Sequence, residues 1–139
     1  MASVLLVDAD DGWLGSLGLF IAAEGHLVRT AHNGVDALNL IRRSAPDIVV
    51  TDCKLPVMDG VDLIRTLRAD PVFALIPVIL TAETRRRPRL PHVRFLKKPF
   101  PATVLLRELQ RVSRRRGGAR EAFKQMTARL AHFRGGAYG

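Results

Sequence analysis

Four side chains suited to handling a phosphoryl group stand at the ends of separate short apolar runs. They are, in chain order, Asp8, Asp52, Thr81 and Lys98. Carboxylates, a hydroxyl and an ammonium fit phosphoryl transfer, which needs a nucleophile and charge neutralisation more than elaborate covalent chemistry. Neighbouring carboxylates repel each other, and a hard divalent cation held by oxygen atoms relieves that repulsion. These residue types therefore indicate a phosphoryl-transfer site, provided that the fold brings them together.

Asp52 has the most distinctive surroundings of the four. The run at residues 48–50 is β-branched throughout and too short for a helix, so it predicts a buried parallel strand. Asp52 then stands at the carboxyl end of that strand, where open α/β sheets bind their ligands. Pro56 and Gly60 predict a shaped loop after it. Aspartate is also a common loop and capping residue, so Asp52 alone does not establish a site.

Apolar runs alternate with segments of helical periodicity along the first 113 residues. The predicted strands lie at residues 4–7, 26–31, 48–50, 77–81 and 93–99. Helical spacing of apolar residues marks 13–21, 37–41, 61–67 and 104–112. This alternation predicts an α/β fold with a flavodoxin-like, doubly wound sheet of five parallel strands in the order 2-1-3-4-5. In that order, strands one, three, four and five end at one edge, which would gather the four side chains.

The stretch from Asp52 to Gly60 reads Asp-x-x-x-Pro-x-Met-Asp-Gly after a hydrophobic strand. It resembles the phosphoacceptor loop of the receiver domains of two-component response regulators, the CheY-like superfamily, and the resemblance extends over residues 3–113. The resemblance implies that Asp52 accepts a phosphoryl group from a phosphohistidine or a small acyl phosphate. It also implies that Thr81 contacts the phosphoryl group and that Lys98, which precedes Pro-Phe, pairs with it.

The same resemblance implies a Mg²⁺ site beside the acceptor. Its ligands would be the carboxylates of Asp8 and Asp52 and the backbone carbonyl of Lys54. Receivers usually have a second acid directly after the first, and this chain has Ala9 at that position. We expect Asp10 to substitute through a small loop shift or a water molecule, with weaker Mg²⁺ binding as the result.

The region between Thr81 and Lys98 also departs from the family pattern. Sixteen residues separate the two, fewer than receivers normally use, and they include an arginine-rich stretch with two prolines at residues 85–91. The prolines and the weak apolar periodicity predict a short basic loop in place of a full fourth helix. Phe95 occupies the family's aromatic switch position, so the resemblance implies a switch residue beside an altered surface.

The end of the chain is a basic tail. Residues 85–139 carry 16 basic and 2 acidic residues, against 6 and 11 in residues 1–84. We place the receiver domain at 1–113 and predict a separate short amphipathic helix in 114–139, where apolar residues recur at helical spacing. The alternatives for this helix are packing back on its own domain, homodimerisation or docking on a partner, and contact with an anionic membrane. Nucleic-acid binding is disfavoured because no DNA-reading module fits the tail.

Bulk composition excludes several classes of protein. A chain of 139 residues that is 47% hydrophobic fits one globular domain. No apolar run approaches the roughly 20 residues of a membrane span. The acids at residues 8, 10 and 11 disfavour a signal peptide. The single cysteine, Cys53, excludes an internal disulfide and fits a reducing cytoplasm.

Besides nucleic-acid binding through the basic tail, the sequence leaves three functions open. The first is a stand-alone receiver that takes a phosphoryl group from a histidine kinase or histidine phosphotransfer protein and signals to a downstream protein partner, without being an enzyme beyond its own phosphotransfer and dephosphorylation. The second is a pseudo-receiver, a binding module that phosphorylation does not switch, which Ala9 suggests. The third is a haloacid-dehalogenase-like phosphatase with Asp8 as nucleophile. It is disfavoured because that family needs an acidic pair after the lysine, and only Glu108 and Glu121 follow Lys98.

Overall fold

The sheet at the centre of the molecule is fully parallel. The computed structural model describes residues 1–85 and 87–137 and, beyond residue 112, the side chains of 114 and 125–131. Its strands are β1 (Ser3–Val7), β2 (Leu27–Ala31), β3 (Ile48–Asp52), β4 (Val78–Ala82) and β5 (Val93–Lys97). They pair in the order β2-β1-β3-β4-β5, which confirms the predicted flavodoxin-like topology.

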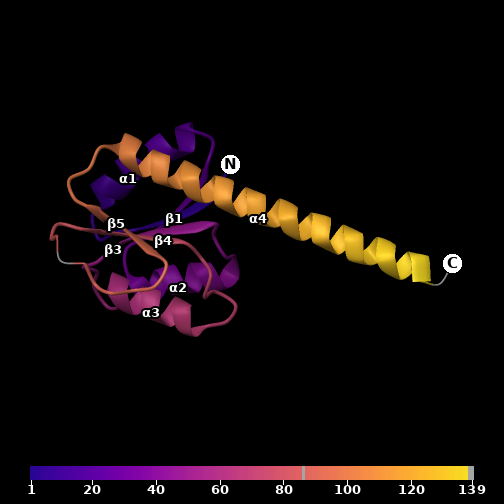
Figure 1. The fold of residues 1–139 in the computed structure, drawn as a ribbon. Coiled ribbons are helices and arrows are strands. Elements are labelled where there is room, and N and C mark those ends of the chain that lie inside the picture. The colour runs from indigo at the N-terminus through magenta and orange to yellow at the C-terminus, as the bar shows by residue number, and fades with distance from the viewer. Residues whose placement is uncertain (86, 138–139) are drawn as a thin grey trace.

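Helices cover both faces of this sheet (Figure 1). One face carries α1 (Asp11–Ala23) and the first part of α4 (Ala102–Ala137), and the other carries α2 (Gly34–Arg43) and α3 (Gly60–Ala69). Three of the helices begin at a side-chain cap: the carboxylate or amide oxygen of the capping residue accepts a hydrogen bond from the backbone N–H three residues later. The capping residues are Asp10, Asn33 and Asp59. Such a cap satisfies one of the free N–H groups that a helix start leaves.

Each face of the sheet has its own hydrophobic core. Along β1, Leu5 and Val7 point into the core under α2 and α3, whereas Val4 and Leu6 point into the core under α1 and α4. Strand β4 is buried along its whole length. Because both faces are covered, the central strands are continuous apolar runs rather than alternating ones, which is why they are recognisable in the sequence.

The connection from β4 to β5 is a loop and not a helix. Residues 83–85 and 87–92 form no helix, so the predicted short loop is confirmed over these residues. The guanidinium of Arg68, at the end of α3, donates hydrogen bonds to the carbonyls of Pro91 (3.2 Å) and His92 (3.1 Å) in this loop. It also donates to the carbonyls of Ala74 (3.1 Å) and Ile76 (2.8 Å) before β4. One side chain therefore ties the loop to the rest of the domain.

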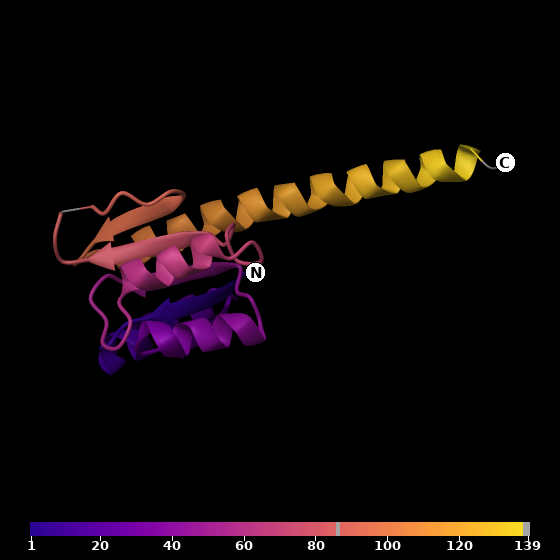
Figure 2. The same cartoon turned by 90° about the horizontal axis from the view of Figure 1, so that it is seen from below.

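The last helix differs from the prediction. The predicted C-terminal helix is present, but we expected it to be separate from a helix ending near residue 113, and α4 is a single helix of 36 residues. Its second half projects away from the domain (Figures 1 and 2), and Met126 and Leu130 are 51% and 57% exposed. The prediction of a break was wrong because glycines in a helix cost only about 1 kcal/mol each. No helix among the described residues combines the length and apolar character needed to cross a membrane.

Candidate functional site

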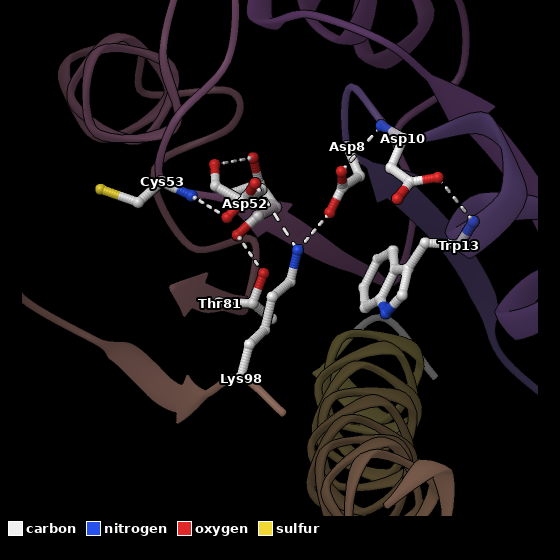
Figure 3. Close-up of polar contacts among 8 residues, drawn as sticks. Asp8, Asp10, Trp13, Asp52, Cys53, Thr81 and Lys98 are labelled. Atoms are coloured by element: carbon white, nitrogen blue, oxygen red, sulfur yellow. Dashed lines mark hydrogen bonds and ion pairs between the residues drawn. The ribbon is translucent and has the colours of Figure 1, made fainter. Parts of the chain in front are cut away.

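The ends of four strands bring together the side chains that the sequence singled out (Figure 3). Asp8 follows β1, Asp52 ends β3, Thr81 lies near the end of β4 and Lys98 follows β5. In the sheet register, Asp52 is paired with Thr81 on the neighbouring strand. The predicted convergence of these four residues at one edge is therefore observed.

Lys98 lies between the two carboxylates. Its Nζ is 2.5 Å from Oδ2 of Asp8 and 3.6 Å from Oδ2 of Asp52. The side chain of Asp8 is only 4% exposed, and those of Lys98 and Asp52 are 17% and 18% exposed. Charges at this depth are screened less than surface charges, so the ammonium is the main counter-ion of both acids within the protein.

Burial raises the pKa of Asp52 above its ordinary value. The negative charge of Asp8 raises it further, while the Lys98 ammonium and the N–H of Cys53 act in the opposite direction. That N–H donates to Oδ1 of Asp52 at 2.9 Å, which leaves Oδ2 facing Lys98. The environment therefore favours the neutral form of this carboxyl more than water does, and makes a neighbouring positive charge favourable.

Thr81 is fully buried, and its hydroxyl donates to the carbonyl of Thr51 at 3.4 Å. The carbonyl of Thr81 accepts a hydrogen bond from the N–H of Cys53 at 2.8 Å. This second bond connects β4 to the residue that directly follows Asp52. The long hydroxyl bond satisfies Thr81 weakly, because hydrogen bonds between oxygens are typically about 2.7–2.8 Å.

Two glycines fix the loop that follows Asp52. The N–H of Gly60 donates to the carbonyl of Cys53 at 2.9 Å, and a Cβ on Gly60 would lie 2.1 Å from the carbonyl oxygen of Asp52. Gly34 approaches the same loop, where its N–H donates to the carbonyl of Met58 at 2.9 Å and a Cβ would lie 2.5 Å from that oxygen. No side chain fits at either position, so the glycines allow the loop to close against β3 and α2.

Asp10 is engaged as a helix cap. One carboxylate oxygen accepts from the N–H of Trp13 at 3.0 Å, and its own N–H donates to Oδ1 of Asp8 at 2.9 Å. Across the described part of the chain, no three His, Cys, Asp or Glu side chains gather as a metal site. Asp8 and Asp52 remain, and two carboxylates fit Mg²⁺, which keeps several waters and takes phosphate oxygens besides.

The sequence did not indicate the aromatic side chains that surround the lysine. The ring of Trp13 faces Lys98, with Nζ 4.3 Å from the ring centroid (Figure 3). Phe100 contacts Trp13 edge to face, with the ring centroids 6.1 Å apart at 88°. The sequence signal that could have indicated these contacts is proximity: Trp13 lies five residues after Asp8, and Phe100 lies two residues after Lys98. On the other side of β5, the guanidinium of Arg87 lies 5.3 Å from the ring centroid of the half-buried Phe95.

Comparisons with known proteins agree with this geometry. A family model described as "Response regulator receiver domain" matches residues 4–110. The transcriptional regulatory protein AfsQ1 of Streptomyces coelicolor is 39% identical over 82 residues, which cover 59% of this chain and 36% of that protein. The transcriptional regulatory protein PrrA of Mycobacterium bovis is 34% identical over 120 residues, which cover 82% of this chain and 51% of that protein.

Solved structures show the same fold. The chemotaxis response regulator CheY4 of Vibrio cholerae matches with a TM-score of 0.74 and 26% identity, over 81% of this chain and 98% of that chain. This chain spans about a third of the length of AfsQ1 and about half that of PrrA. The family match covers most of the chain and includes all four residues at the sheet edge. The chain belongs to the response regulator receiver domain family of two-component signalling.

Proposed function

We propose that Asp52 accepts a phosphoryl group from a histidine kinase, a histidine phosphotransfer protein or a small acyl phosphate, and that the phosphorylated domain signals by contact with a downstream protein partner. The observation that carries this proposal is the placement of the Asp52 carboxylate at a strand end, 3.6 Å from the Lys98 ammonium. The proposed location is the cytoplasm, where kinases have access to ATP.

In the proposed reaction, an oxygen of the Asp52 carboxylate attacks the phosphorus atom of the donor. The bond from phosphorus to the donor's imidazole nitrogen breaks, and the imidazole leaves with the bonding electron pair and takes up a proton. The Lys98 ammonium, already beside Oδ2 of Asp52, neutralises charge on the phosphoryl oxygens. The Thr81 hydroxyl, weakly bonded to the Thr51 carbonyl, turns to donate to a phosphoryl oxygen.

The same site would hold Mg²⁺ through the carboxylates of Asp8 and Asp52 and the carbonyl of Lys54, with Asp10 in place of the acid missing at Ala9. The bound ion would neutralise charge on the transferred group. Because Oδ1 of Asp10 already caps α1 by accepting the N–H of Trp13, recruiting this carboxylate as a ligand competes with the cap. We therefore expect Mg²⁺ binding to be weak.

Mass spectrometry after treatment with acetyl phosphate tests the proposal. With Mg²⁺ present, the wild-type protein should gain the mass of one phosphoryl group, and Asp52→Asn should gain none. Asp59→Asn is a matched control, because Asp59 is a nearby loop acid that caps α3 and has no contact with Lys98 among the described interactions. A wild-type protein that stays unmodified would refute the phosphoacceptor role.

The second candidate is a pseudo-receiver that binds partners without being phosphorylated. The absence of a third acid beside Asp8 and Asp52, within the residues that the structure describes, favours it. The connection between β4 and β5 also favours it, since the described part of this connection forms no helix and its Arg87 guanidinium lies 5.3 Å from the ring centroid of Phe95 on β5. If this candidate is correct, Ala9→Asp should restore Mg²⁺-dependent phosphorylation that the wild type lacks. Equal phosphorylation of both proteins would contradict it.

A further inference from the structure

We propose that Trp13 is a positioning residue that holds the Lys98 ammonium at the carboxylate edge, where the phosphoryl group on Asp52 would meet it. The proposal rests on the phosphoacceptor role of Asp52 and adds a residue to it. Trp13 lies in the first turn of α1, three residues after the helix cap Asp10, and reaches the lysine from the side opposite Asp52's strand neighbour Thr81 (Figure 3).

Three contacts define the position of the ammonium. Nζ of Lys98 lies 4.3 Å from the ring centroid of Trp13, 2.5 Å from Asp8 and 3.6 Å from Asp52. An ammonium over the face of an indole is attracted by the negative charge of that face. The ring therefore attracts the Lys98 ammonium in addition to the two carboxylates. It does so without adding a third negative charge beside Asp52.

The ring of Trp13 is itself held in place. Asp10 fixes its backbone N–H, and the edge-to-face contact with Phe100 sets the plane of the ring. Phe100 comes two residues after Lys98, so the lysine and its aromatic support belong to the same segment after β5. Apolar neighbours would be sufficient if Trp13 only stabilised the core. Its ring also contacts the Lys98 ammonium, which a purely structural role does not require.

A cavity beside Trp13 offers the Lys98 side chain a second possible orientation. It has a volume of about 480 Å³ and is lined by Asp10, Trp13, Glu83, Lys98, Pro99 and Phe100. The carboxylates of Asp10 and Glu83 offer Lys98 alternative partners on that side. With the indole ring removed, the lysine is free to turn toward them and away from Asp52. Trp13 thus favours one orientation of a long, flexible side chain that carries several rotatable bonds.

The rate of Asp52 phosphorylation by acetyl phosphate tests this role. Trp13→Leu should lower the limiting rate about tenfold and Trp13→Phe about threefold, since a smaller ring attracts a cation less and leucine does not attract it. The KM for acetyl phosphate should change little, because Trp13 acts through Lys98. In a Lys98→Ala background, Trp13→Leu should have no further effect. Phe20→Leu is the matched control, as it truncates another α1 aromatic of the same core.

A second measurement does not depend on phosphorylation. The ring current of Trp13 should shift the Lys98 side-chain proton resonances upfield, and Trp13→Leu should remove that shift while the circular dichroism spectrum of the fold stays unchanged. An unshifted Lys98 in the wild type, or equal rates for wild type and Trp13→Leu, would overturn the proposal. A wild type that shows the ring-current shift but no phosphorylation would instead refute the phosphoacceptor role and with it the effect of Trp13 on that reaction.

Discussion

Lys98 is paired more closely with Asp8 than with Asp52: its Nζ is 2.5 Å from the first carboxylate and 3.6 Å from the second. The site is therefore a small ionic network in which one cation lies beside two acids. In Asp52, Oδ1 accepts the N–H of Cys53 and Oδ2 faces Lys98 at the longer distance.

Removal of the cation should destabilise the fold. We expect Lys98→Met to lower the free energy of unfolding by about 2–3 kcal/mol, less than for a fully buried pair, because it leaves two poorly solvated carboxylates without a counter-ion. Urea denaturation in the presence of EDTA measures this loss. The double variant Lys98→Met/Asp8→Asn should recover part of it, since one negative charge is also removed. Equal stability of single and double variants would show that the network is not electrostatic.

Arg68 should be important for the loop that connects β4 to β5. Its guanidinium donates to four carbonyls, two in that loop and two before β4. We expect Arg68→Met to cost about 2–4 kcal/mol of unfolding free energy and to make residues 83–92 susceptible to proteolysis. Arg68→Lys should rescue little, because an ammonium lacks the planar fork that reaches several carbonyls at once. Unchanged proteolysis in Arg68→Met would contradict this role.

His26 should make the stability of the fold depend on pH. Burial lowers its pKa below the ordinary value of 6.5, the N-terminal ammonium lowers it further, and Glu24 acts in the opposite direction. Its Nδ1 accepts the N–H of Ala2 at 3.0 Å, which only an unprotonated Nδ1 can do. As the pH falls below 6.5, the unfolded chain binds a proton that the folded chain resists, so stability decreases.

The substitution His26→Asn separates this contribution from the rest. Asparagine keeps an acceptor near the position of Nδ1 but cannot titrate. The loss of unfolding free energy between pH 7 and pH 5, measured by thermal or urea denaturation, should be smaller in His26→Asn than in the wild type. Identical pH profiles for the two proteins would exclude His26 as a source of the dependence.

The projecting half of α4 should contribute little to the stability of the domain. Leu105 and Leu109 are fully buried, whereas Met126 and Leu130 are exposed. A chain ending at residue 113 should therefore unfold within about 0.5 kcal/mol of the full chain. A chain ending at residue 103 is the control and should not fold stably, since it lacks both buried leucines. A large loss in the 1–113 chain would move the domain boundary proposed at residue 113.

The sequence predicted the sheet order and the convergence at its edge because both follow from apolar strand runs that end in polar residues. Side-chain contacts such as Trp13 with Lys98 could not be predicted, since they depend on rotamers and on the relative placement of α1 and β5. The same limit applies to Arg68, whose acceptors Pro91 and His92 are 23 and 24 residues away in the sequence. Spacing along the chain does not contain that information.

The continuity of α4 was also not predicted, because two adjacent glycines suggested a helix end. The glycine pair at 117–118 indicates a helix end, yet Leu109 and Val112 are in the same heptad phase as Met126 and Leu130. A sequence pattern that keeps its phase across two glycines is compatible with one uninterrupted helix. The heptad pattern of the apolar residues therefore predicted the continuity of α4 better than the low helix propensity of the two glycines.

The single helix α4 connects the segment that follows Lys98 to a helix end far from the sheet. It begins four residues after Lys98 and continues for 36 residues, which corresponds to a rod about 54 Å long. A tilt of about 5° at its base would displace its tip by about 5 Å. A rearrangement of the segment after β5 that tilted this helix would therefore be amplified along its length, as by a lever arm.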